Sequence, residues 1–270
     1  MDLNNGKHYR KLRQFRDEQP AEWEQHLVKL IRSRTLPVEH KLVDGYSVGT
    51  DTSGTEYRIN SHGCRSKPFA EIKHKPCIVG IGCSITYGTG LDPEEIWIHK
   101  LAELMNTEYI CLAMPGSGLT VTSLYAAEHI LPVFDNIQAV FTYTPPPNRI
   151  DMPQLTDFDE SQYPIQDQDI RVKSLINIIE QEPYTATDTE LLRALEHTAF
   201  IQYEKDRLLL ELATQRHNVP NFVLDSVQFG QTDLVQLNQH TYTRARDGEH
   251  DGAELHTDIA NTFYSTFCDK

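Results

Sequence analysis

The sequence has few of the features that mark secreted, membrane-spanning or nucleic-acid-binding proteins. Its five cysteines are an odd number with no CxxC pair, which argues against a disulfide framework and favours a reducing compartment. No run approaches the roughly 18 apolar residues of a membrane span, and the N-terminus lacks the apolar core of a secretory signal. Basic residues are scarce: 25 Lys and Arg face 39 Asp and Glu, a net charge of −14. We therefore expect a cytoplasmic protein with no membrane or nucleic-acid partner.

The sequence does contain short apolar runs that alternate with helical patterns. Apolar runs bounded by turn residues predict four strands, at 77–81, 109–114, 139–144 and 221–226. Apolar residues at helical spacing predict helices at 92–106, 118–134, 188–219 and 256–267. Strand–helix alternation with short connections indicates an α/β fold with a central parallel sheet and helices on both faces.

The first 56 residues differ from this pattern and are interpreted as an N-terminal extension, with residues 57–270 forming the main domain. Trp23, Leu27, Leu30 and Ile31 recur at helical spacing after Pro20, which predicts an amphipathic packing or docking helix. The Gly-, Ser- and Thr-rich stretch 44–69 indicates turns and a hairpin. A long polar excursion at 145–169 has the length of a functional loop.

Chemistry-bearing residues follow the predicted strands. Ser84 and Thr86 follow the first strand, the loop 113–118 follows the second, and Asn148 follows the third. Asp247 and His250 lie near the C-terminus. Ligands of parallel sheets bind at the carboxyl ends of the strands. A serine needs a base such as histidine, which a carboxylate orients, and the developing oxyanion needs donors placed in advance. Together, these residues can supply the nucleophile, the base, the orienting carboxylate and the oxyanion donors.

The same residues resemble the sequence blocks of the SGNH, or GDSL-type, hydrolases. The family's Gly-Asp-Ser block is matched by 82–88, "GCSITYG", and its Asn-x-Gly block by 111–116, "CLAMPG". Its asparagine block is matched by Asn148 and its Asp-x-x-His block by Asp247 to His250. The lead-in "YRINSHGCRS" at 57–66 is also similar to some family members, several of them encoded by bacteriophages. The resemblance extends from about Tyr57 to Phe267.

The resemblance implies a three-layer α/β/α, flavodoxin-like fold and hydrolysis of a carboxylic ester without a cofactor or metal. Ser84 would be the nucleophile, His250 the base and Asp247 its orienting carboxylate. The oxyanion and substrate would be bound by the loop residues Ala113 and Gly116 together with Asn148. A small-molecule or carbohydrate ester, such as an O-acetylated sugar, would be the substrate. The resemblance also implies that the protein, if it is encoded by a phage, would be released or carried on the virion.

The chain departs from the family pattern at four places. Cys83 replaces an aspartate, Ala113 a glycine, and Cys111 an asparagine, while Arg149 follows Asn148 where an aspartate is usual. The first change removes hydrogen bonds around the nucleophile turn, and the methyl group of Ala113 narrows the acyl pocket. These departures concern substrate and rate more than fold.

Several alternatives stay open at this point. Cys83 could be the nucleophile, although neighbouring residues leaving a strand point in different directions. Ser84 and Asn148 could be ordinary turn residues, and Asp247 and His250 could cap the last helix. His250 and His256 with nearby aspartates could hold a metal. A degenerate protein that only binds a carbohydrate or a protein, or an acyltransferase that uses the same serine, are the alternative functions.

Overall fold

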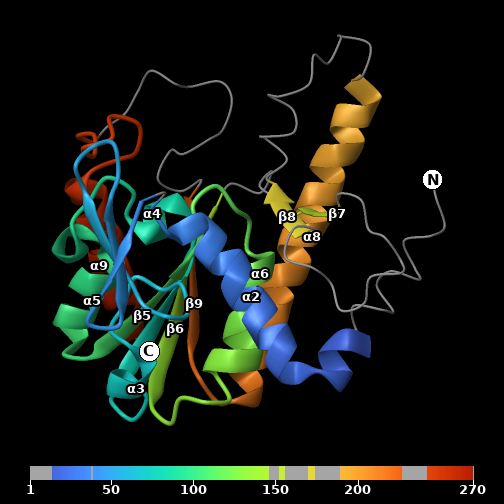
Figure 1. The fold of residues 1–270 in the computed structure, drawn as a ribbon, viewed down its shortest axis with the longest axis horizontal. Helices are drawn as coiled ribbons and strands as arrows, with labels where there is room; N and C mark the ends of the chain where they lie inside the picture. Colours follow the sequence, from blue (N-terminus) through green and yellow to red (C-terminus); the bar gives the residue numbers. More distant parts are fainter. Residues whose placement is uncertain are drawn as a thin grey trace.

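The computed structural model describes residues 14–37, 39–145, 152–155, 170–173, 189–226 and 242–269. Its centre is a parallel sheet whose strand order is β5-β4-β6-β9 (Figure 1). Its strands are β4 (Cys77–Gly82), β5 (Glu108–Ala113), β6 (Ile137–Thr144) and β9 (Asn221–Asp225). All three neighbouring pairs are parallel. The predicted mixed α/β fold with a central parallel sheet is confirmed.

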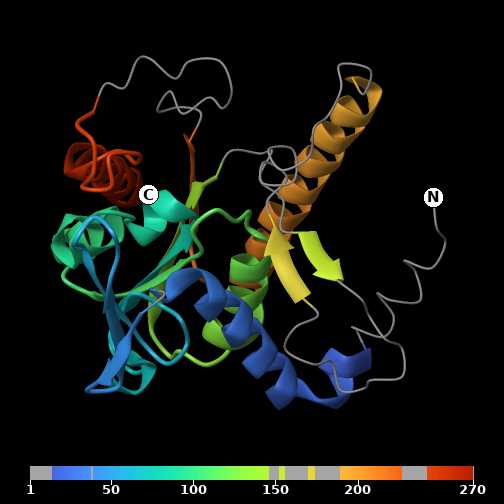
Figure 2. The same cartoon turned by 45° about the horizontal axis from the view of Figure 1, so that its top comes forward.

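Helices cover both faces of this sheet. The helices α5 (Trp97–Met105) and α9 (Ala253–Cys268) pack together on one face. On the other face lie α6 (Thr120–Tyr125), α8 (Thr189–Arg216) and α2 (Pro20–Thr35), with α6 between the two longer helices (Figures 1 and 2). The predicted long helical segment is thus a single helix, α8.

The first strand of the sheet explains how both faces are built. Every residue of β4 is buried, as its unbroken apolar run predicts. Ile78 belongs to the cluster that contains Trp97 and Phe263, whereas Val79 belongs to the cluster that contains Leu27 of α2. This alternation is the two-residue period of a strand. The amphipathic N-terminal helix therefore contributes to the core beneath the sheet.

The predicted helix over 92–106 is wrong in its first turn. Asp92 and Glu95 form the expected capping box, but it closes a short 3-10 turn, η1 (Pro93–Glu95). The α-helix begins at Trp97, because the Trp97 N–H donates to Nδ1 of His256, 2.9 Å away in α9. That bond joins residues 159 positions apart, so no local pattern could indicate it.

The second helix also differs from the prediction. The segment 118–134 contains α6 and then a π-helical turn, η2 (Ala126–Ile130), instead of one α-helix. Other short helices of the described residues include α3 (Phe69–Ile72) and α4 (Ser84–Tyr87). The terminal helix was predicted at 256–267 and begins slightly earlier, at Ala253.

Among the described residues, two antiparallel sheets lie outside the central sheet. The strands β1 (Lys41–Val43), β2 (Tyr46–Thr50) and β3 (Glu56–Ile59) pair in sequence order, as expected for the turn-rich stretch 44–69. The strands β7 (Met152–Leu155) and β8 (Ile170–Lys173) also pair, so the segment 145–169, which was predicted to be a loop, contains a strand, β7. The boundary between residues 56 and 57 stays a prediction, and β2 and β3 pair across it.

Two simpler expectations concern cysteines and membranes. None of the five cysteines, all of which lie in the described residues, forms a disulfide bond, and every one except Cys268 is buried. Within the described ranges, every helix is too short or too polar to span a bilayer.

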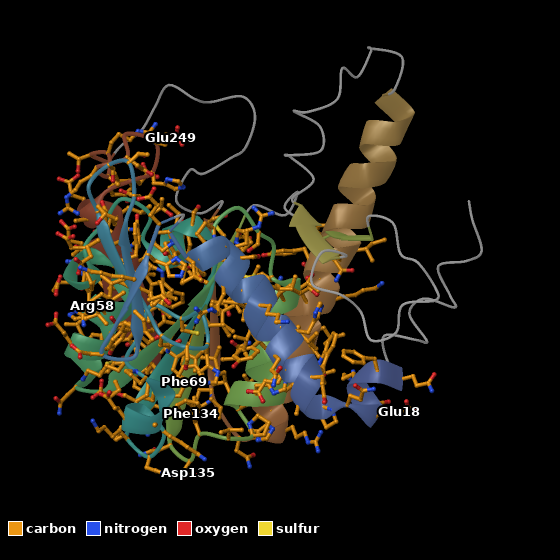
Figure 3. All side chains as sticks on the ribbon, in the orientation of Figure 1. Glu18, Arg58, Phe69, Phe134, Asp135 and Glu249 are labelled. Atoms are coloured by element: carbon orange, nitrogen blue, oxygen red, sulfur yellow. The ribbon has the colours of Figure 1, made fainter. Side chains whose placement is uncertain are left out.

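The carboxyl ends of the central strands lie at one end of the molecule. The α4 helix, which follows β4, and the loop that precedes α9 are both at this end (Figures 1 and 2). Glu249 in that loop lies at this end, whereas Phe134 and Asp135, which precede β6, lie at the other end of the molecule (Figure 3). The chain runs from β4 outward to β5 and then crosses to β6 on the other side of β4. The carboxyl end of β4 is therefore the topological switch point, where ligands of such sheets bind.

Candidate active site

Ser84 occupies the switch point. It is the first residue of α4, directly after the Cys83 that links this helix to β4. The side chain is 5% exposed, and its hydroxyl lies 4.0 Å from the Cys83 Sγ, a long contact. Thr86 faces the core, where its Oγ1 accepts a hydrogen bond from Trp97 Nε1 at 3.3 Å. Of the two hydroxyl residues after β4, Thr86 therefore supports the turn.

Asp247 and His250 form a hydrogen-bonded pair on the loop before α9. His250 Nδ1 lies 2.6 Å from Asp247 Oδ2, and the backbone N–H groups of Glu249 and His250 both donate to Asp247 Oδ1 at 3.1 Å. Burial alone would raise the pKa of Asp247, but these hydrogen bonds outweigh it and lower the pKa. The carboxylate is thus ionised and accepts from Nδ1–H, which leaves Nε2 of His250 as a proton acceptor.

The loop that carries this pair packs against the loop that follows Ser84. The Arg246 N–H donates to the Gly90 carbonyl at 3.1 Å. A Cβ placed on Gly90 would lie 3.0 Å from the Asp247 backbone nitrogen and 3.1 Å from its carboxyl carbon. The Thr89 N–H in turn donates to the Ser84 carbonyl at 3.2 Å. One short loop, 88–91, is therefore bonded to the Ser84 turn and also contacts the turn that carries Asp247 and His250.

Tyr143 of β6 lies near both halves of the candidate site. Burial is the main cause that raises the pKa of its phenol, and electrostatic interactions with Cys83 and Asp251 raise it further. Cys83 precedes Ser84, and Asp251 follows His250, so residues next to both candidate groups lie within electrostatic range of one side chain. This side chain was not recognised in the sequence, where it is an ordinary aromatic residue of a buried strand.

The candidate oxyanion residues are only partly described. Ala113 is the last residue of β5 and pairs in register with Gly82, and the next N–H, of Met114, donates to the Gly82 carbonyl at 3.3 Å. Gly116 adopts a left-handed φ of +71° in the loop that follows. Both residues thus stand at the same sheet edge as Ser84. Asn148, with Arg149, lies outside the described residues.

The metal interpretation finds no support in the described residues. His256 is fully buried, and its Nδ1 accepts the Trp97 N–H. Burial, with smaller effects of Lys100, Arg65 and His250, lowers the pKa of His256 to about 3, so this imidazole is a neutral core residue. Nowhere in the described part of the chain do three or more His, Cys, Asp or Glu residues cluster as metal ligands.

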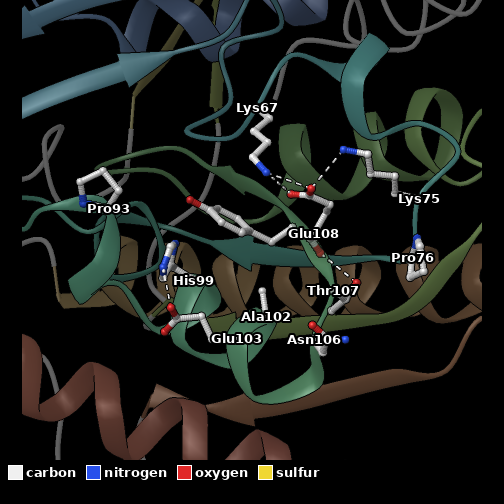
Figure 4. Close-up of a pocket in the computed structure, with 11 residues that line it drawn as sticks. Lys67, Lys75, Pro76, Pro93, His99, Ala102, Glu103, Asn106, Thr107 and Glu108 are labelled. Carbon is white, nitrogen blue, oxygen red and sulfur yellow. Dashed lines mark hydrogen bonds and ion pairs between the residues drawn. The ribbon is translucent and has the colours of Figure 1, made fainter.

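A large groove among the described residues lies elsewhere. It has a volume of about 730 Å³ and is lined by residues around Glu108, at the amino end of β5 (Figure 4). Lys67 and Lys75 both pair with Glu108, and His99 lies 3.5 Å from Glu103. These charges are satisfied within the protein. The groove is at the opposite end of the strands from Ser84, and nothing in it points to a ligand.

Two residues of the lead-in segment reach the site and were not assigned a role from the sequence. The Tyr57 hydroxyl accepts a hydrogen bond from the Gly90 N–H at 2.8 Å, and the Arg65 guanidinium binds carbonyls of the loop that follows Ser84. The similarity of the segment "YRINSHGCRS" to some family members was the sequence feature that could have pointed to Tyr57 and Arg65. Its partners could not be read from the sequence because they are backbone groups about 20 to 35 positions away.

The comparisons with known proteins are sparse. No protein-family model matches the sequence, and no curated protein matches it. A carbohydrate acetylesterase family member from Sinorhizobium meliloti has a similar structure, with a TM-score of 0.31, 10% identity, and coverage of 71% of this chain and 97% of that one. AlinE4, an SGNH-hydrolase family esterase, gives a TM-score of 0.27, 13% identity, and coverage of 72% and 97%.

Proposed function

We propose that this protein is a serine hydrolase of the SGNH type, which cleaves a carboxylic ester through an acyl group on Ser84. The observation that carries the proposal is the placement of the Asp247–His250 pair on the loop that Gly90 joins to the Ser84 turn. A serine at a switch point, with an oriented imidazole on the adjoining loop, is the constellation of nucleophilic ester hydrolysis.

In the proposed reaction, Ser84 Oγ attacks the ester carbonyl carbon while Nε2 of His250 takes the hydroxyl proton. His250 then gives this proton to the leaving alcohol, and the acyl group stays on Ser84 as an ester. A water molecule attacks that ester and loses a proton to His250. His250 then returns this proton to Ser84 Oγ as the bond between Oγ and the acyl carbon breaks, which releases the carboxylic acid and restores the serine. Asp247 stabilises the imidazolium in both steps. The N–H groups of Ser84 and Ala113, with the Asn148 side chain, bind the oxyanion, and Gly116 shapes the loop around it.

The proposed substrate is a small acyl ester, with an O-acetyl group on a carbohydrate as the first choice. The methyl group of Ala113, in place of the glycine of the SGNH pattern, narrows the acyl side of the site. The small residues of the loop after β5 suit a shallow, open site that a sugar could enter. No cofactor or metal takes part in this mechanism.

Hydrolysis of p-nitrophenyl acetate by the parent and three variants tests the proposal. We expect Ser84→Ala and His250→Ala each to lower kcat by about a thousandfold or more, because the nucleophile and its base act as a unit. Cys83→Ala, the matched control, keeps kcat within about tenfold because its thiol takes no part in the reaction. Full activity of Ser84→Ala would contradict the proposal.

A second assay, with an acetylated oligosaccharide as substrate, separates hydrolysis from the two alternatives. Release of acetate from an acetylated oligosaccharide without any added sugar acceptor supports hydrolysis. Acetate release that depends on a sugar acceptor would instead identify a transferase that uses the same serine. A parent protein that binds the oligosaccharide but leaves every ester intact would identify a degenerate protein. Cys83 would explain that last outcome, because it replaces the family's aspartate and removes hydrogen bonds around the nucleophile turn.

A further inference from the structure

The lead-in segment 57–66 places two buried side chains on the loop that follows Ser84. Tyr57 is 3% exposed, and its hydroxyl accepts the Gly90 N–H while donating to Asp51 Oδ2, both at 2.8 Å. The Asp51 carboxylate also accepts from Ser53 and from the Thr55 N–H. A continuous relay of hydrogen bonds thus runs from the antiparallel strands to the backbone of Gly90.

Arg65 binds the backbone of the same loop. It is 2% exposed, and its guanidinium donates to the carbonyl oxygens of Tyr87 (3.0 Å), Gly88 (2.8 Å) and Leu91 (2.5 Å). Its carbon Cζ lies 4.7 Å from the centre of the Tyr57 ring. Backbone carbonyls and an aromatic face compensate the buried charge. Because three carbonyls share one rigid fork, the shape of the loop depends on this side chain.

The loop then contacts the candidate acid–base pair directly. Gly90 has a left-handed φ of +76°, and its Cα faces Asp247 so closely that a methyl group would lie 3.0 Å from the Asp247 nitrogen. The Gly90 carbonyl accepts the Arg246 N–H at 3.1 Å. A displacement of Gly90 must therefore move the turn that holds Asp247 and His250.

We propose that Tyr57 and Arg65 are positioning residues of the active site, which fix the loop 88–91 and through Gly90 set where Asp247 holds His250. This inference rests on the proposed function. It also assigns a role to the "YRINSHGCRS" segment: its tyrosine, in strand β3, and its arginine, in the loop after β3, both bind the loop that follows Ser84.

The electrostatics of the relay agree with this role. Burial is the main cause that raises the pKa of Tyr57 to about 12, so the phenol stays protonated and can accept and donate at the same time. Burial would raise the pKa of Asp51, but hydrogen bonds from Ser53, Tyr57 and Thr55 lower it. A charged acceptor at one end of the relay strengthens the bond at the other end.

The first test compares Tyr57→Phe with Tyr87→Phe. The two rings stack at 5.3 Å, both are buried, and each variant loses one hydroxyl, but the Tyr87 hydroxyl donates to the Thr35 carbonyl and does not reach Gly90. We expect Tyr57→Phe to lower kcat for p-nitrophenyl acetate by about tenfold with KM nearly unchanged, because a small misplacement of the base slows the chemical step. Tyr87→Phe keeps kcat within about twofold. Equal kcat values for the two variants would overturn the inference.

The second test uses glycines of equal backbone strain. Gly90 and Gly45 have φ values of +76° and +81°, but a Cβ on Gly45 meets nothing within 4 Å. Replacement by alanine therefore strains both turns, whereas only Gly90→Ala pushes against Asp247. We expect Gly90→Ala to lose about tenfold or more in kcat and Gly45→Ala to keep it within about twofold. The opposite ranking, or no difference, would contradict the inference.

A spectroscopic measurement separates this inference from the proposed function. The proton on His250 Nδ1, held 2.6 Å from Asp247, should give a low-field proton signal whether or not the protein hydrolyses esters. We expect that signal to shift or disappear in Tyr57→Phe and Gly90→Ala and to persist in Tyr87→Phe and Gly45→Ala. If the parent is inactive, this pattern still supports the positioning role. An unchanged signal in Tyr57→Phe and Gly90→Ala would refute the positioning role even if the parent is active.

Discussion

The two loops that carry the candidate catalytic groups are held in opposite ways. The segment 84–91 is almost entirely buried, and its carbonyls and N–H groups are bound by side chains from distant parts of the chain. The turn at 247–250 is partly exposed, and most of its hydrogen bonds are local: Asp247 binds the N–H groups of Glu249 and His250 and the imidazole itself. Its long-range attachment runs through Arg246 and Gly90.

This difference indicates that the segment 84–91 around Ser84 is held rigidly and that the turn 247–250 around His250 can adjust its position. A group fixed by many long-range contacts keeps its geometry only while the fold is intact, whereas a local turn can move as a unit. Exposure also suits the proposed base, since in the proposed reaction the imidazole of His250 exchanges protons with water and product. The comparison predicts that substitutions packed against the Ser84 turn lower the free energy of unfolding more than substitutions in the turn 247–250.

The largest expected effect on stability comes from Gly82→Ala compared with Gly248→Ala. A Cβ on Gly82 would lie 2.7 Å from the Tyr143 carbonyl and even closer to Thr86 Oγ1, so backbone would have to shift. On Gly248, whose φ is +74°, a Cβ meets nothing within 4 Å. Urea unfolding should show a loss of about 3 kcal/mol for Gly82→Ala and about 1 kcal/mol for Gly248→Ala. Equal losses would show that the two loops are not held differently.

A smaller effect is expected from the pH dependence of His256. Its folded pKa of about 3 lies below the unfolded value, so the unfolded chain binds a proton that the folded chain does not. This contribution to stability is fully present above about pH 6.5 and is lost as the pH falls toward 3, by about 2 kcal/mol between pH 6 and pH 4.

The His256→Asn variant tests this, because an amide oxygen can still accept the Trp97 N–H. Urea unfolding at several pH values should show a flatter stability curve for His256→Asn than for the parent. His40→Asn, a change of an exposed histidine, is the control and should leave the curve unchanged. A parent curve that is already flat between pH 6 and pH 4 would contradict the buried, neutral state of His256.

The fold was predictable where local signals and burial agree. The apolar run of β4 and the capping box at Asp92 are both present as expected. The break at Ile96 was not predictable, because the N–H of Trp97 binds His256 of the last helix instead of continuing the turn. Local propensity indicates where a helix can start, but a tertiary hydrogen bond decided where this one does.

The contact between Asp247 and His250 was predictable from the sequence, but the contacts that support this pair were not. Asp247 and His250 are three positions apart, so their spacing already implied that they could pair, and the structure confirms their contact. The relation of this turn to Ser84 depends on Gly90, whose role follows from its close approach to Asp247. The carbonyls that Arg65 binds leave no trace in the sequence, since every residue has one.

Covalent labelling of the parent with a fluorophosphonate, followed by mass spectrometry of the labelled peptide, tests the central claim most directly. We predict a single phosphonylated site at Ser84, labelling that survives in Cys83→Ala, and loss of labelling in both Ser84→Ala and His250→Ala. An adduct on Cys83, or labelling of the parent that continues unchanged in His250→Ala, would contradict the account.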